Sequence, residues 1–204
     1  MLNLRELINV FRAATPMDTF AAQKISLSTG ALTYAMSFVV VAALLSVEVL
    51  LLTIIGWSGS GSDLMSLAIS IGLVLVGAIV LIPILLIVQL ICIFIWGAAH
   101  FYIAKFFSNK PENLNDFNGS LMSLFASVKF VQGVVFLIPV IGWIVAGFLH
   151  LYGLALTFKF VKSRFNLTDV QGVIVVLLPL DIILGLMLIG TIVLSVALIG
   201  SSLI

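Results

Sequence analysis

Polar side chains that lie inside long apolar stretches are the first candidates for chemistry in this sequence. Ionisable groups at bilayer depth cost several kcal/mol unless they are paired, so each one requires an explanation. The set comprises Glu48, Gln89, His100, Lys129, His150 and Asp181.

Lys129 and Asp181 are candidates for a buried ion pair. If the inner ends of their spans lie near residues 118 and 171, the two residues lie about 16 and 15 Å along their helices. Opposite charges at one depth compensate each other, and Pro179 would loosen the backbone beside the acid. We expect this pair to join two spans, either as a packing contact without a transport role or as part of an ion pathway.

Glu48 is expected in the outer half of the membrane, about level with Gln89. A protonated Glu48 that hydrogen-bonds to Gln89 is the favoured interpretation. The alternative is an ion or proton site.

His100 and His150 are expected about 10 and 13 Å from the inner ends of their spans. Two imidazoles at similar depth could share a metal, but two ligands without a third are a weak signal. Ordinary hydrogen bonds between helices are favoured, and neither a metal nor a cofactor is expected. The lone cysteine, Cys92, is interpreted as a packing residue.

The motifs of common enzyme classes are missing from the sequence. No serine has a plausible His and acid partner, no H-E-x-x-H motif occurs, and no Gly-rich nucleotide loop is present. A net charge of +1 gives no basic field for nucleic acid. We therefore do not expect an enzyme or a nucleic-acid-binding protein.

Composition indicates the elements that must position these residues. The 204 residues are 63% hydrophobic and 8% charged, with a mean hydropathy of +1.36. This is typical of an all-α, polytopic transmembrane helical bundle with about five spans. After an interfacial arm over residues 1–30, a single transmembrane domain over 31–204 would have spans near 31–56, 64–107, 118–138, 141–163 and 171–200.

Residues 64–107 allow two interpretations, a hairpin of two spans near Pro83 or one long or broken span. One crossing places Lys and Arg from both ends of the chain on the same side of the membrane, whereas a hairpin divides them. The positive-inside rule therefore favours one crossing and a cytoplasmic N-terminus, although hydropathy alone favours the hairpin.

Short polar segments predict the helix boundaries. Residues 1–30 have helical amphipathic spacing, and Thr15, Pro16 and Asp18 predict the start of a second short helix there. Residues 58–62 predict a short turn, and Asp116 or Asn118 is expected to cap the span that follows.

Several short motifs resemble the Yip (Ypt-interacting protein) domain family, especially its compact prokaryotic members. They are Thr15-Pro16-Met17-Asp18-Thr19-Phe20, Asp116-Phe117, Phe136-Leu137-Ile138-Pro139-Val140-Ile141-Gly142-Trp143, Leu151-Tyr152-Gly153-Leu154 and Phe165-Asn166-Leu167-Thr168-Asp169-Val170-Gln171-Gly172. Asn109-Lys110-Pro111-Glu112 and Lys129 depart from the family pattern. The resemblance implies five spans and a cytoplasmic N-terminus, and its eukaryotic members look like trafficking factors that associate with Rab-type GTPases.

The expected function is that of a non-enzymatic membrane scaffold or adaptor. The chain is expected to be a multi-pass integral protein of the prokaryotic plasma membrane. Its partners would be membrane lipids and other transmembrane helices, in a homo- or hetero-oligomer. One alternative is a small transporter or ion pathway that uses Glu48, Lys129 and Asp181. Another is an accessory subunit of a larger membrane complex.

Overall fold

A computed structural model describes residues 17–60, 63–138 and 141–201. Within these ranges the chain is all-α and contains no strand, as expected. The helices are α2 (Met17–Ala22), α3 (Leu27–Ser60), α4 (Leu64–Phe107), α5 (Leu114–Phe136), α6 (Ile141–Phe165) and α7 (Asp169–Ser201).

Four of the described helices, α3 to α6, are long and apolar enough to cross a membrane. Their lipid-compatible surfaces carry many exposed large apolar side chains, which a protein surrounded by water does not tolerate in such numbers. With its 33 residues, α7 provides a further long helix of apolar sequence. The chain is a multi-pass membrane protein, and the expectation of about five spans is consistent with these helices.

Helix α4 is a single continuous helix of 44 residues with Pro83 inside it. A helical hairpin near Pro83 is therefore not formed, and the continuous helix agrees with the interpretation of residues 64–107 as one long span. Apolar surroundings favour continuation of the helix because a break would leave several backbone groups without partners, whereas proline removes only one N–H donor.

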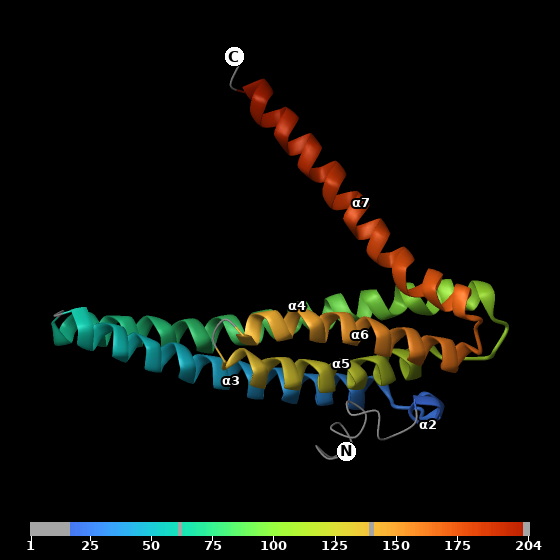
Figure 1. Ribbon diagram of the computed structural model, residues 1–204, viewed down its shortest axis with the longest axis horizontal. Coiled ribbons are helices and arrows are strands. Elements are labelled where there is room, and N and C mark those ends of the chain that lie inside the picture. Colours follow the sequence, from blue (N-terminus) through green and yellow to red (C-terminus); the bar gives the residue numbers. More distant parts are fainter. Residues whose placement is uncertain (1–16, 61–62, 139–140, 202–204) are drawn as a thin grey trace.

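The four helices α3 to α6 run alongside one another, and α3 and α4 project beyond α5 and α6 at one end (Figure 1). Helices α3 and α5 are parallel neighbours that pack very closely. A Cβ at Gly30 would overlap the backbone of Gly119, and a Cβ at Gly133 would overlap the side chain of Val41. The missing side chains allow this approach, because two helix backbones can meet only where small residues face each other.

The most compact part of the bundle lies at the end where α2 packs against α6. Aromatic side chains from four helices pack together there with ring centroids 5.4–6.0 Å apart: Phe20, Phe101, Phe117, Phe160 and Phe165. All five side chains are buried. This cluster fixes the relative positions of the helix ends, while the opposite end of the α3–α4 pair has few contacts outside that pair (Figure 1).

Helix boundaries differ from the expected ones where side-chain caps decide them. Asn113 caps α5 by accepting a hydrogen bond from the Asn115 N–H at 2.8 Å, so the expected cap at Asp116 or Asn118 is wrong. Thr168 and Gln171 form a reciprocal capping box at the start of α7.

Two expectations concern segments at the edge of the described ranges. Helix α3 continues through Ser60, so the expected turn at 58–62 is helical over its first three residues. The short helix α2 lies where a second helix was expected, but Thr15, Pro16 and the rest of residues 1–16 lie outside the described residues.

Candidate intramembrane pocket

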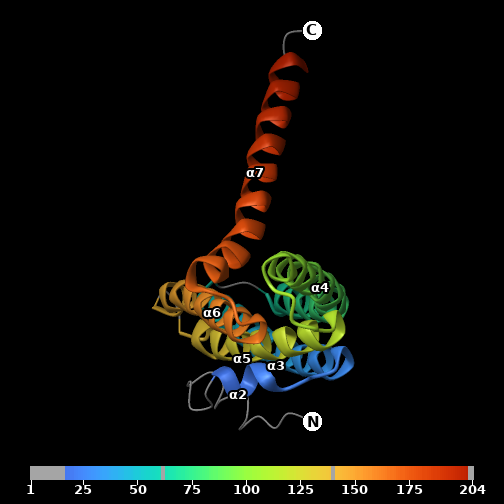
Figure 2. The same ribbon diagram turned by 90° about the vertical axis from the view of Figure 1, so that its right-hand side faces the viewer.

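A cavity of about 690 Å³ lies within the bundle and opens on its flank. Its lining residues come from α4, α5, α6 and α7, with one residue from α3. Helices α4 and α6 lie on either side of the bundle above α5, and α7 leaves the bundle on the side of α6 (Figure 2). The lining comprises Tyr34, Cys92, Ile93, Ile95, Trp96, Ala99, Ile103, Phe125, Val128, Lys129, Gln132, His150, Gly153, Leu154, Pro179, Leu180 and Ile182.

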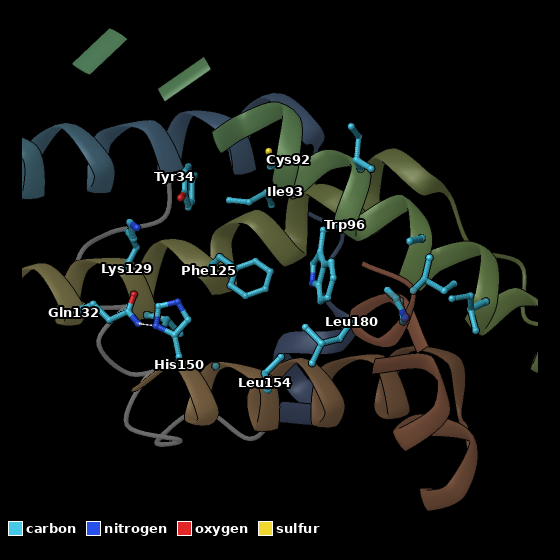
Figure 3. Close-up of a pocket in the computed structure, with 17 residues that line it drawn as sticks. Tyr34, Cys92, Ile93, Trp96, Phe125, Lys129, Gln132, His150, Leu154 and Leu180 are labelled. Carbon is cyan, nitrogen blue, oxygen red and sulfur yellow. Dashed lines mark hydrogen bonds between the residues drawn. The ribbon is translucent and has the colours of Figure 1, made fainter. Parts of the chain in front are cut away.

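The polar side chains of this pocket gather at one end. Lys129, Gln132 and His150 lie together there, whereas Trp96, Leu154 and Leu180 line the other part (Figure 3). The walls are otherwise apolar. An apolar cavity with a few convergent polar groups is the usual form of a binding site.

Lys129 has no ion-pair partner among the residues that the structure describes. Its side chain is half-buried in the pocket wall. Asp181 is exposed, although its neighbours Leu180 and Ile182 line the same pocket. The expected ion pair between Lys129 and Asp181 is therefore not formed within one chain, because α7 turns away from the bundle near these residues (Figure 1).

His150 and Gln132 join α6 to α5. The Gln132 Nε2 amide donates to His150 Nδ1 at 2.6 Å, which confirms the expected hydrogen bond between helices for His150. The expectation is wrong for His100, which donates from Nδ1 to the Trp96 carbonyl of its own helix at 2.7 Å. No group of three potential metal ligands occurs in the described part of the chain.

Gln89 is paired with Tyr34 rather than with Glu48. The Tyr34 hydroxyl donates to Gln89 Oε1 at 2.6 Å and thereby joins α3 to α4. Glu48 lies 14 residues beyond Tyr34 on α3, about 21 Å along the helix. The expected hydrogen bond between Glu48 and Gln89 is wrong, because α4 is shifted along α3 relative to the assumed alignment.

Sequence reasoning missed a buried ionic contact at the compact end of the bundle. In the sequence Arg164 is one of several basic residues after an apolar run, but its side chain is 3% exposed and pairs with Glu112 at 2.6 Å. The same guanidinium donates to the backbone carbonyls of Ala21, at the end of α2, and of Gln23, just after it. Nothing in the spacing of these residues indicated that α2 folds back onto α6.

Basic residues concentrate at this same end. Lys105 lies in the last turn of α4, and Lys162 and Arg164 lie in the last turn of α6. Lys110 donates to the Arg164 carbonyl at 2.7 Å, and Lys162 pairs with Asp169 at the start of α7. The far ends of α3 and α4 carry no Lys or Arg.

Comparison with family models, with curated proteins and with solved structures found no match for this chain.

Proposed function

We propose that the protein is a non-enzymatic membrane scaffold or adaptor that receives an apolar segment of another membrane component in the pocket between α4 and α6. The observation that supports this is the pocket itself, which opens on the flank of the bundle and is walled mainly by apolar side chains. In a bilayer such an opening faces neighbouring helices and lipid tails. Docking of a helix there needs close packing and a few polar contacts.

The alternative of a transporter requires its ionisable residues to share a route. Gly133 of α5 packs against Val41 of α3, so Lys129, four residues before Gly133, lies near the level of residue 37 on α3. Glu48 lies about ten residues, or about 15 Å, farther along that helix. Because Glu48 is remote from the pocket, the distribution of charges favours the scaffold over an ion pathway.

The proposed orientation places the N-terminus and the basic end of the bundle in the cytoplasm of a prokaryotic cell. Support comes from Lys105, Lys110, Lys162 and Arg164 at one end and from the lack of basic residues at the other. Membership of the Yip family is compatible with this orientation and is part of the proposal.

A photo-crosslinking amino acid in the pocket tests the scaffold function. Leu154 lines the pocket, whereas Phe148 lies on the same helix, is 67% exposed and is not part of the lining. We expect a protein adduct of one defined mass from position 154 in native membranes and only lipid adducts from position 148. Lipid adducts alone from both positions would contradict the scaffold function.

A flux assay tests the rival function. Purified protein in liposomes is expected to leave proton and small-cation permeability at the level of protein-free liposomes. Permeability that rises with the protein and falls again with Lys129→Met would establish transport and overturn the proposal.

A further inference from the structure

Within the described part of the chain, Lys129 and Asp181 each lack an ion-pair partner, although they carry opposite charges in long apolar helices. Neither residue takes part in either of the two ion pairs found in the described ranges. Leaving both unpaired in a bilayer is costly for each residue, and pairing them removes both costs together. The two residues therefore need a contact that one isolated chain does not supply.

The depths of the two charges match when they are measured from the same point. Lys162 pairs with Asp169, so this contact is a common reference for α6 and α7. His150 lies 12 residues before Lys162 on α6, about 18 Å above the reference, and its hydrogen bond places Gln132 at the same level. Lys129 lies three residues before Gln132 on α5, which puts it about 14 Å above the reference. Asp181 lies 12 residues after Asp169 on α7, which is about 18 Å along the helix. Because α7 is inclined to the bundle, the height of Asp181 above the reference is less than this length (Figure 1).

Helix α7 is anchored to its own bundle only over its first turns. Gly172 packs closely against Phe158, and Val175 and Val176 are buried. Leu180 and Ile182 still line the pocket, and farther along the chain α7 leads away from α4 and α6, with Ile189 exposed (Figures 1 and 2). Where its side chains are described, this part of α7 has an apolar surface that its own chain leaves open.

We propose that a second copy of this chain supplies the missing surface, so that Asp181 of each copy enters the pocket of the other and pairs with its Lys129. A two-fold axis makes the contact reciprocal, so both charges of both copies are neutralised at once. Gly185 and Gly190 have no atom within 4 Å of where a Cβ would lie, so they leave the α7 backbone open to a neighbouring helix. The polar end of the pocket adds Gln132 and His150 as neighbours of the incoming carboxylate (Figure 3).

This inference rests on the proposed scaffold function and names its partner. The two can fail separately. A single adduct of a different protein at position 154, on a chain that stays monomeric, would leave the scaffold standing and overturn the second-copy contact. Flux through the purified protein would overturn the scaffold whatever the oligomeric state.

Co-expression of two charge variants with different affinity tags tests the contact. A Lys129→Asp copy carries two acids at the contact, and an Asp181→Lys copy carries two bases. Each variant alone forms like-charged contacts, whereas the mixed dimer has both contacts restored. We expect at least about tenfold more of the mixed dimer than in a control that combines Lys129→Asp with Glu48→Lys.

The double variant in one chain separates contacts between copies from contacts within a copy. If the two residues pair within one copy, the chain that carries both Lys129→Asp and Asp181→Lys should accumulate as wild type does, whereas the co-expressed single variants should not. This result would overturn the inference. Wild-type behaviour of both single variants would overturn it as well. If the single variants accumulate only when they are co-expressed, the inference is supported.

Disulfide trapping gives an independent measurement that does not depend on charge variants. In a Cys92→Ser background, one tagged copy carries Lys129→Cys and the other carries Asp181→Cys. We expect a disulfide-linked dimer that contains both tags when the copies are co-expressed in membranes and oxidised. The absence of this species, with the folded chains present as monomers, would contradict the proposal.

Discussion

Arg164 and Glu112 form a buried ion pair in which Nη2 lies 2.6 Å from Oε1 and both side chains are at most 5% exposed. The pair joins the end of α6 to the segment before α5. Because the same guanidinium also holds the backbone after α2, three segments distant in sequence meet at one side chain. The basic end of the bundle is therefore a packed structure and not only a charged surface.

Removal of one partner of this pair should be strongly destabilising. We expect Glu112→Gln or Arg164→Gln to lower the free energy of unfolding by about 3–5 kcal/mol, because the remaining charge stays buried without compensation. Thermal or denaturant unfolding of the purified protein in detergent measures this loss.

The matched control is Lys162→Gln, which breaks a pair whose side chains are 40% and 77% exposed. Its expected cost is at most about 1 kcal/mol. Equal effects of Glu112→Gln and Lys162→Gln would show that burial does not set the strength of the Arg164 contact.

The close approach of α3 to α5 predicts a sharp difference between glycines. Gly30→Ala should destabilise the bundle by about 1–3 kcal/mol, since its new methyl group overlaps the backbone of Gly119 and the helices must separate. Gly147→Ala is the control, because no atom lies within 4 Å of its Cβ position. The unfolding midpoint should fall for Gly30→Ala and should stay level or rise for Gly147→Ala. A Gly30→Ala variant that is as stable as wild type would refute the close packing of α3 and α5.

The hydrogen bond between Tyr34 and Gln89 predicts a measurable coupling between α3 and α4. Tyr34→Phe should cost about 0.5–1.5 kcal/mol, because the Gln89 carbonyl loses its donor. Tyr102→Phe serves as the control, since Tyr102 is 63% exposed. A double-mutant cycle with Gln89→Leu should show that the two losses are not additive, whereas strictly additive losses would argue against a direct contact.

The class of fold could be predicted from the sequence, because the long apolar runs indicated membrane helices. For residues 64–107 the distribution of Lys and Arg favoured one long span over a hairpin, and the continuous helix α4 agrees with that preference. Both features depend on the cost of placing charge in hydrocarbon, which acts on each segment separately. Such signals need no knowledge of which helices are neighbours.

Contacts between helices were much less predictable. The depth of Glu48 and Gln89 was estimated from the ends of their spans, but α3 has 34 residues and α4 has 44, so the ends do not define a common level. The partner of Gln89 is Tyr34, which lies about four turns away from Glu48 along α3. The expected ion pair between Lys129 and Asp181 is not formed within the chain, and the path of α7 after Pro179 could not be predicted from the sequence.

Arg164 shows a second limit of sequence reasoning. In the sequence it is one of several basic residues after an apolar run, and the usual place of such a residue is the aqueous interface. Its burial depends on α2 packing against α6, which brings the carbonyls of Ala21 and Gln23 to the guanidinium. No local pattern near residue 164 encodes that long-range contact.

The central structural claim is that α4 crosses the membrane once, because this crossing sets the depth of the pocket and of both unpaired charges. Ser66 lies near the start of α4, and Ser108 lies just after its end. In a Cys92→Ser background, Ser108→Cys should react with a membrane-impermeant thiol reagent only from the cytoplasmic face, and Ser66→Cys should never react from that face. Reaction of both cysteines from the same face would contradict the account.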